Sequence, residues 1–227
     1  MKKQFKPLII TSLILVYLVI AAGAVVRMTG SGMGCPDWPK CFGYLIPPTE
    51  RNQLDWKSNH QYREGEVIIV NESLRVASSD FNSSEEYESK NWETYTKHDY
   101  ALFNATHTWI EFINRLIGAL SGLPVLALAI IGVWGVRRNV WNAVLSVGVL
   151  FLLLFEAWLG KLVVDGNLVP NQITIHMMGS VAIVLLLLAL RARNTPSPAP
   201  LPQPVRNGLL FLLVLIVVQI FLGTQTR

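Results

Sequence analysis

Ionisable and amide side chains interrupt segments of this chain that are otherwise apolar. A charged side chain at the centre of a membrane costs about 2.5–3.5 kcal/mol on insertion scales, so such residues are candidates for chemistry. A carboxylate there can hold a proton or orient water, and an imidazole can bind a metal ion. The residues concerned are His107, Glu111, Asn114, Arg115, Glu156, Lys161, His176 and, at the end of the first apolar segment, Arg27.

The spacing of these residues predicts a single polar site. Glu111, Asn114 and Arg115 stand at positions i, i+3 and i+4, which are neighbours on the surface of a helix. At about 1.5 Å of rise per helical residue, the other polar residues lie within about 12 Å of the same membrane surface. We therefore expect a carboxylate, an imidazole and several cations near one end of a helix bundle.

Haem is the ligand that best fits this combination of side chains. Imidazole ligates haem iron axially, helix bundles commonly hold such cofactors, and basic side chains can neutralise propionates. The alternative for His176 is an ordinary hydrogen-bonded core histidine, and the sequence leaves both interpretations open. Arg115 and Lys161 either contact propionates or pair with Glu111 and Glu156 while their long side chains reach the interface.

The two cysteines, Cys35 and Cys41, lie close together in GCPDWPKC (34–41). On the oxidising side of a membrane such a pair can form a disulfide that closes a small loop. A simple structural staple and a bond that takes part in thiol–disulfide exchange are both compatible with this spacing.

The composition predicts an all-α integral membrane protein. Of 227 residues, 52% are hydrophobic and 15% charged, whereas soluble domains carry about 25% charged residues. A helix of about 20 apolar residues crosses the hydrocarbon core. Such windows predict a four-helix transmembrane bundle plus a fifth transmembrane helix, at 8–26, 107–136, 143–164, 173–190 and 208–222.

The distribution of lysine and arginine predicts how these helices are oriented in the lipid bilayer. Basic residues of short connections stay on the cytoplasmic side, and here they occupy the N-terminus, 137–138 and 191–206, whereas 27–106 is net acidic. We therefore expect a multi-pass protein of the bacterial plasma (inner) membrane with a cytoplasmic N-terminus. The net charge of +4 then reflects topology and indicates no nucleic-acid partner.

The connection 27–106 is predicted to be a long polar extracytoplasmic loop. Its part from about 50 to 100 is acidic and rich in serine and asparagine, for example in SSDFNSSEEYESK (78–90). We expect this part to be a solvated surface loop.

A weak internal repeat divides the chain. Gly and Arg stand four apart at the ends of the first and last apolar helices, as Gly23 with Arg27 and Gly223 with Arg227. This predicts a four-helix haem-binding unit over 1–193, a Pro-rich cytoplasmic linker over 194–207, and the first helix of an incomplete second unit over 208–227. We therefore expect a truncated or split protein, and assembly of two chains into a homo-oligomer stays open.

Several segments together resemble the haem A synthase family, the membrane enzymes that oxidise the methyl group of haem O. These segments are GAVVRMTGSGMGCPDWPKCFG (23–43), HTWIEFINRLIGALSG (107–122), FEAWLGKLVVDGNLVPNQITIHM (155–177) and QIFLGTQTR (219–227). They occur in the order expected for the family, along essentially the whole chain.

The resemblance implies a fold, a reaction and roles for particular residues. The family has eight helices in two four-helix halves, the first holding the substrate haem O and the second a haem B cofactor. By position, His176 matches the axial ligand of the iron, Glu111 the catalytic carboxylate, and Cys35 and Cys41 the outer cysteine pair. Two hydroxylations with oxygen from water give a gem-diol that loses water to form haem A for cytochrome oxidase. Haem O synthase and cytochrome oxidase assembly factors are the implied partners.

The chain departs from the family pattern at two points. Many members have a second axial histidine three residues after the carboxylate, where this chain has Asn114. Either His176 binds alone and leaves an open coordination position, which we favour, or His107 at the membrane boundary replaces the missing ligand; an exposed surface histidine is the simpler interpretation of His107. The second departure is that helices six to eight of the family are missing.

Two functions of other classes stay open. A non-catalytic b-type cytochrome would bind haem and pass electrons without forming the formyl group. A membrane thiol oxidoreductase would use Cys35 and Cys41, although no second cysteine pair is present to relay electrons.

Overall fold

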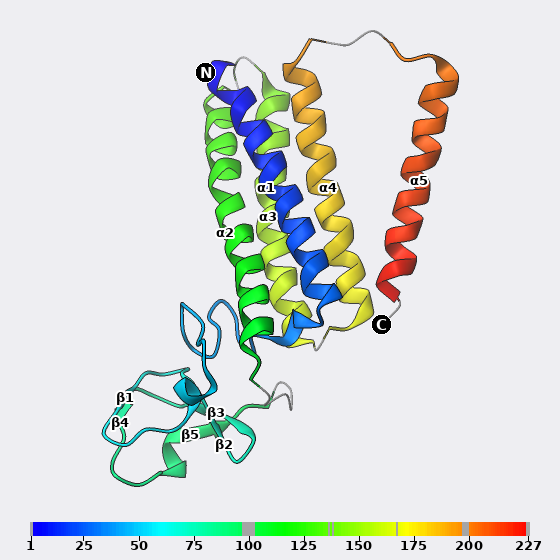
Figure 1. Cartoon of the computed structure of the whole chain (residues 1–227). Helices are drawn as coiled ribbons and strands as arrows, with labels where there is room; N and C mark the ends of the chain where they lie inside the picture. Colours follow the sequence, from blue (N-terminus) through cyan, green and yellow to red (C-terminus); the bar gives the residue numbers. More distant parts are fainter. Residues whose placement is uncertain are drawn as a thin grey trace. The chain divides into compact units, whose positions relative to one another are not determined.

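The computed structural model describes residues 2–96, 103–135, 137, 139–166, 168–196 and 200–225. Its α-helices are α1 (Lys2–Met28), α2 (Ala105–Trp134), α3 (Val140–Asp165), α4 (Pro170–Asn194) and α5 (Gln203–Gln225), shown in Figure 1. The chain divides into two compact units. We call Met1–Ile20, Ile117–Val163 and Leu168–Arg227 the helical unit, and Ala21–Leu116 with Val164–Asn167 the mixed unit.

All five apolar segments predicted to cross the membrane are confirmed as helices. Each of the five helices is long and apolar enough to cross a membrane. The helices extend past the apolar windows at most ends; α4, for example, begins at Pro170 and ends at Asn194. Polar residues at a helix end can still complete backbone hydrogen bonds, so a helix can extend beyond its apolar segment. The all-α class therefore holds for the membrane-spanning part of the chain.

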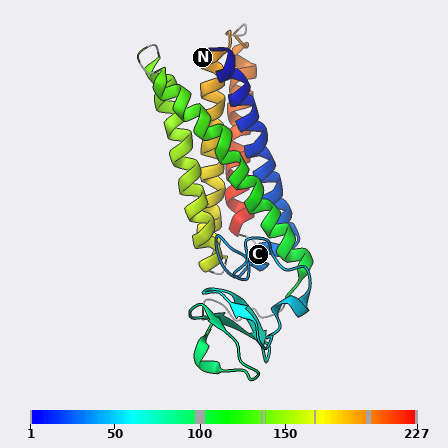
Figure 2. The same ribbon diagram turned by 90° about the vertical axis from the view of Figure 1, so that its left-hand side faces the viewer.

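The helical unit is held together by one face from each of α1, α2, α3 and α4, which lie side by side in Figures 1 and 2. In α4 the inward face consists of Ile183, Val184, Leu187 and Leu190, whose spacing places them on one stripe of the helix. The buried residues of the other helices are Phe5, Ile9, Leu13, Val16, Val125, Leu128 and Val149. The outward faces of these helices are apolar as well, as expected for side chains that contact lipid.

Helix α5 contacts the rest of the helical unit through α4. The two hydroxyl groups of Thr174 and Thr224 lie 2.7 Å apart, and the side-chain amide of Gln225 donates to the Thr174 hydroxyl at 2.8 Å. Large apolar side chains on the remaining surface of α5 are exposed. The helix begins at Gln203, earlier than the predicted position 208.

The segment between α1 and α2 contains β-structure, so the all-α class does not extend to it. The solvated loop predicted for about 50–100 is wrong for residues 61–94; residues 97–100 lie outside the described part. The strands form a two-stranded sheet, β1–β4, and a three-stranded antiparallel sheet, β2–β3–β5. Their bounds are β1 (Gln61–Tyr62), β2 (Val67–Val70), β3 (Ser73–Ala77), β4 (Phe81–Asn82) and β5 (Trp92–Thr94); short 3-10 helices occur at Ser31–Met33, Arg51–Leu54 and Ser89–Asn91.

Turn and aromatic residues explain why these strands form, although the segment as a whole is acidic. β2 and β3 are joined by Asn71 and Glu72, both with positive φ, as in the tight hairpin turns that suit the twist of antiparallel strands. Tyr62 and Trp92 are buried and in edge-to-face contact, with ring centroids 4.9 Å apart. Phe81 and Tyr87 stack on this pair. A small aromatic core therefore stabilises a segment whose overall composition suggested a loop.

This core predicts the effect of one substitution. Trp92→Ala should destabilise the strands by about 3–5 kcal/mol, because it removes a large buried ring and leaves a cavity. Cleavage of the folded protein by trypsin at Arg63 and Arg75 should become much faster. Leu45→Ala is the matched control, since that side chain is 78% exposed in the same unit. Equal cleavage rates for the two variants would contradict the aromatic core.

Candidate functional site

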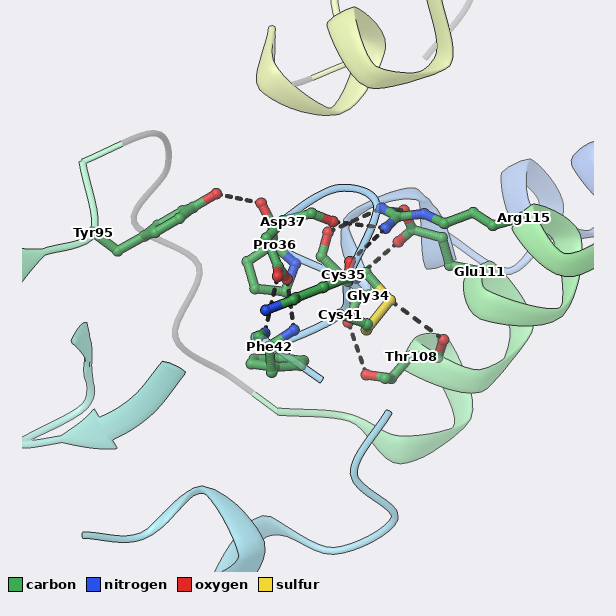
Figure 3. Close-up of a disulfide and its surroundings, with 12 residues drawn as sticks. Gly34, Cys35, Pro36, Asp37, Cys41, Phe42, Tyr95, Thr108, Glu111 and Arg115 are labelled. Atoms are coloured by element: carbon green, nitrogen blue, oxygen red, sulfur yellow. Dashed lines mark hydrogen bonds and ion pairs between the residues drawn. A yellow bond between two sulfur atoms is a disulfide. The ribbon is translucent and has the colours of Figure 1, made fainter. Parts of the chain in front are cut away.

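The disulfide predicted as one option for the cysteine pair is present in the mixed unit. Cys35 and Cys41 are bonded, and both are fully buried. Gly34 precedes the pair and lies directly against the first turn of α2; a Cβ on Gly34 would come within 2.5 Å of the His107 carbonyl group. The Thr108 hydroxyl donates to the Gly34 carbonyl oxygen at 2.8 Å. The loop is therefore fixed to the start of α2, as Figure 3 shows.

Glu111 is held at both of its carboxylate oxygens. Oε2 accepts the backbone N–H of Cys35 at 2.8 Å, and Oε1 contacts Nη2 of Arg115 at 2.5 Å. The residue is 3% exposed. Because Glu111 and Arg115 are four residues apart on one helix, they meet on the same face, as the sequence predicts. This carboxylate is thus oriented by a cation and by the backbone of the disulfide loop.

Arg115 also organises the loop itself. Its Nη1 donates to the carbonyl oxygens of Asp37 at 2.6 Å and Lys40 at 3.0 Å, and its Nη2 reaches the Cys35 carbonyl oxygen at 3.4 Å. The planar guanidinium has five donors, which suits it to such a set of acceptors. In this structure Arg115 is therefore occupied by the chain's own oxygens, which is the pairing alternative that the sequence left open.

Asp37 is a residue of the disulfide loop that the sequence analysis did not single out. Its carboxylate accepts the backbone N–H groups of Phe42 at 2.5 Å and Gly43 at 2.9 Å, so it closes the disulfide loop from within. Burial raises the pKa of Asp37, and the two amides and Arg115 oppose this rise. Tyr95 donates its hydroxyl to the Pro36 carbonyl oxygen, and burial followed by the Asp37 charge raises the pKa of Tyr95. An aspartate two residues after the first cysteine was the available sequence signal.

The other predicted residues of the mixed unit are placed as follows. Asn114 is half-buried, and its Oδ1 has no hydrogen-bond partner among the described residues. A Cβ on Gly23 of α1 would stand 3.9 Å from that oxygen. His107 is half-buried in the first turn of α2, and Arg27 is exposed at the end of α1. An unpaired amide oxygen facing a glycine leaves an acceptor available to a ligand.

The helical unit brings together Glu156 of α3 and His176 of α4. Oε2 of Glu156 lies 2.6 Å from Nδ1 of His176, with the carboxylate side chain 6% and the imidazole 37% exposed. This distance is within hydrogen-bond range, but Nδ1 makes no aligned hydrogen bond in the orientation that the ring has here. Lys161 is half-buried and makes no hydrogen bond or ion pair with any described residue. The sequence predicted pairing for Glu156 and Lys161 only as an alternative, and it is His176 that Glu156 contacts.

These side chains fit a haem better than a bare metal ion. Within the described ranges, no group of three or more His, Cys, Asp or Glu side chains is arranged to hold a metal. Haem iron takes four donors from the porphyrin and needs only one or two from the protein. The half-exposed imidazole of His176, with its Nδ1 edge against a carboxylate, can supply one such donor through Nε2.

The position of Arg115 predicts how the disulfide loop responds to mutation. Arg115→Gln removes charge-assisted bonds to three loop carbonyls, each worth about 1.5–3 kcal/mol. The disulfide should then be reduced at least about tenfold faster by dithiothreitol, measured by alkylating the released thiols over time. Lys40→Gln is the matched control, because it removes a positive charge from the same loop but leaves the carbonyl that Arg115 binds. Wild-type kinetics in Arg115→Gln would show that Arg115 does not hold the loop.

Comparison with known proteins gives a consistent result. The family model described as COX15-CtaA: Cytochrome oxidase assembly protein matches residues 6–81 and 64–227. A curated relative named Heme A synthase from Shewanella oneidensis is 27% identical over 76% of this chain and 40% of its own length. Relatives of the same name from Bartonella quintana and Bacillus licheniformis are 24% and 39% identical, over 76% and 34% of this chain and 41% and 25% of their own lengths. The matched chain thus spans less than half of these relatives, and no solved structure matches it significantly.

Proposed function

This chain belongs to the COX15-CtaA family of cytochrome oxidase assembly proteins, and on that premise we propose that it acts as a haem A synthase. The proposed substrate is haem O, whose methyl group becomes the formyl group of haem A. The observation that carries the proposal is the pair of a half-exposed imidazole and a buried carboxylate, His176 with Glu156, on two membrane helices of a chain with this family membership.

The proposed reaction oxidises a methyl group with oxygen from water. Each hydroxylation replaces a C–H bond by a C–O bond and releases two electrons and two protons. The gem-diol reached after two such steps loses water to give the formyl group. The electrons would pass to an acceptor of the membrane, and haem B would be the cofactor that relays them. Haem O synthase supplies the substrate, and cytochrome oxidase assembly consumes the product.

We assign His176 as the axial ligand of the iron of haem O. Its Nδ1 side is covered by Glu156, so Nε2 is the nitrogen that remains for the iron. Asn114 stands where a second histidine would be, and an amide is a poor iron ligand, which favours an open coordination position; His107 remains the alternative second ligand. With His176 as the one protein ligand, the second axial position would be left for water or another small ligand.

Glu111 is the proposed catalytic carboxylate. Arg115 and the Cys35 amide hold its two oxygens, and such fixed orientation is what a group that positions water requires. Lys161, half-buried and unpaired among the described residues, is the strongest candidate for a haem propionate. Arg27 and Arg115 are further candidates, although Arg115 would have to share its donors with the loop carbonyls.

We also propose the domain organisation expected from the repeat. Residues 1–193 form one four-helix haem-binding unit, the connection after α4 is a cytoplasmic linker, and α5 is the first helix of a second unit. The exposed apolar surface of α5 supports this assignment, since a helix of a bundle normally buries one stripe against several neighbours. A second copy of the chain could supply such neighbours in a homo-oligomer.

The reaction is tested by following haem itself. The chain is expressed in a strain that accumulates haem O, alone and together with the part of the Shewanella oneidensis relative that the match leaves uncovered. Haem A should appear in extracted haems, and Glu111→Gln should keep bound haem but lose about 100-fold or more of the conversion, as for removal of a general base. A folded, haem-bound protein that forms no haem A would contradict the proposed reaction. Undiminished conversion by Glu111→Gln would remove Glu111 from the mechanism.

The proposed location is the bacterial inner membrane, with the segment between α1 and α2 outside the cytoplasm. Single cysteines introduced at Glu85 and Thr195, both exposed, report this orientation, because Cys35 and Cys41 are protected in a disulfide. In intact cells a membrane-impermeant maleimide should label Glu85→Cys, and it should label Thr195→Cys only after the membrane is opened. The reverse pattern would invert the topology.

A further inference from the structure

The carboxyl group of Glu156 is buried in the helical unit and has one strong contact. Oε2 lies 2.6 Å from Nδ1 of His176, while Oε1 has no hydrogen-bond partner among the described residues. Glu156 is only 5% exposed. A buried carboxylate with an unpaired oxygen costs free energy, and replacing a buried ion pair by apolar residues is often neutral or stabilising. The fold alone therefore does not account for a glutamate at this position.

Neighbouring residues are shaped around this carboxylate. Gly179 of α4 has no Cβ, and a Cβ there would overlap the Glu156 carboxyl group. The Ser180 hydroxyl lies 3.1 Å from the His176 carbonyl oxygen and 3.4 Å from Glu156 Oε2, so it can donate its proton to either. On the α3 side, Gly160 leaves the Cε1 edge of the imidazole uncovered by any side chain of its own. The site thus admits the carboxylate close to α4, and the imidazole side chain is 37% exposed.

The contact fixes which imidazole nitrogen can bind a metal. Nδ1 of His176 and Oε2 of Glu156 are within hydrogen-bond distance but are not aligned as a hydrogen bond. A rotation of the imidazole ring that turns an Nδ1–H toward the carboxylate would complete the bond. A carboxylate at this distance favours the tautomer with the proton on Nδ1, because that N–H can then donate to it. The lone pair is then on Nε2. Histidines that ligate metals commonly donate their other N–H to a carboxylate or a carbonyl, which orients the ring and makes it a stronger donor.

We propose that Glu156 is a positioning residue that holds the Nδ1–H of His176 and thereby presents Nε2 to haem iron. The inference rests on the proposed ligation of haem by His176 and adds the residue that makes this ligand effective. It also gives Glu156 a role distinct from that of the basic residues in the polar cluster predicted from the sequence, because an anionic carboxylate repels a propionate. Arg27, Arg115 and Lys161 remain the candidates for that contact.

The proposal predicts a change in the bond between the ligand and the iron. When the carboxylate accepts the Nδ1–H, the imidazole donates more electron density, which stiffens the iron–nitrogen bond and stabilises ferric over ferrous haem. Losing such a partner typically weakens metal binding about 10–100-fold. Both effects are properties of bound haem and do not require turnover.

The experiment uses the full chain in detergent, loaded with haem B as the probe. Glu156→Gln should shift the iron–histidine stretching band of the ferrous haem to lower frequency, raise the midpoint potential, and speed transfer of haem to apomyoglobin about tenfold or more. Gly179→Ala should move both spectroscopic quantities in the same direction, because it displaces the carboxylate while the charge is retained. Ser146→Ala is the control: it removes a buried hydroxyl from the same helix α3, about 15 Å along the axis from Glu156.

Two outcomes separate this inference from the proposed function. If His176→Ala loses haem while Glu156→Gln keeps the wild-type stretching band and potential, the ligation stands and the role of Glu156 is overturned. If His176→Ala retains haem with the wild-type spectrum, the ligation itself is wrong, and the inference falls with it. A shift in Ser146→Ala as large as that in Glu156→Gln would also overturn the inference, since it would trace the effect to general repacking of α3.

Discussion

The structure depends on one constraint: a carboxylate buried on a helix that crosses a membrane is costly without a partner. Water is absent from the hydrocarbon region, so an isolated carboxylate or guanidinium there is costly. Among the residues that the structure describes, Glu111 and Glu156 are buried carboxylates, and they satisfy the constraint differently. Glu111 pairs with Arg115 on its own helix and with the backbone of the disulfide loop. Glu156 pairs with an imidazole on a neighbouring helix. Each pairing places a chemically useful group where an apolar residue would have served packing alone.

The surroundings of these two carboxylates suit them to different chemical roles. The Glu111 carboxylate is surrounded by donors, and its partner Arg115 also binds three carbonyls of the loop closed by Cys35 and Cys41. A change in that loop therefore reaches Glu111 directly, through hydrogen bonds of the mixed unit. Glu156 instead has an unpaired oxygen and a single strong contact, which suits a group that tunes a metal ligand. The reaction that we propose needs both tasks: a fixed carboxylate for water and an iron ligand of sufficient donor strength.

Sequence reasoning succeeded where the physics is local. Spans of about 20 apolar residues predict helices without knowledge of the fold, and the i, i+4 spacing predicts the contact of Glu111 with Arg115. It failed for β2 and β3, because the acidic, serine-rich surroundings concealed a short apolar run and its turn at Asn71. It also could not predict that Glu156 contacts His176, since that contact depends on how α3 and α4 pack. Gly179 is a local trace of this packing, but a lone glycine in a helix has many explanations.

The central claim is that His176 supplies the iron ligand. The most direct test removes its imidazole by mutation and supplies free imidazole in its place. The His176→Gly chain is loaded with haem B, and its absorption spectrum is recorded without and with excess imidazole. We expect the ligated haem spectrum to be lost in the variant and restored by imidazole, which can occupy the vacated space beside Glu156. A variant that keeps the wild-type spectrum without imidazole would contradict the account.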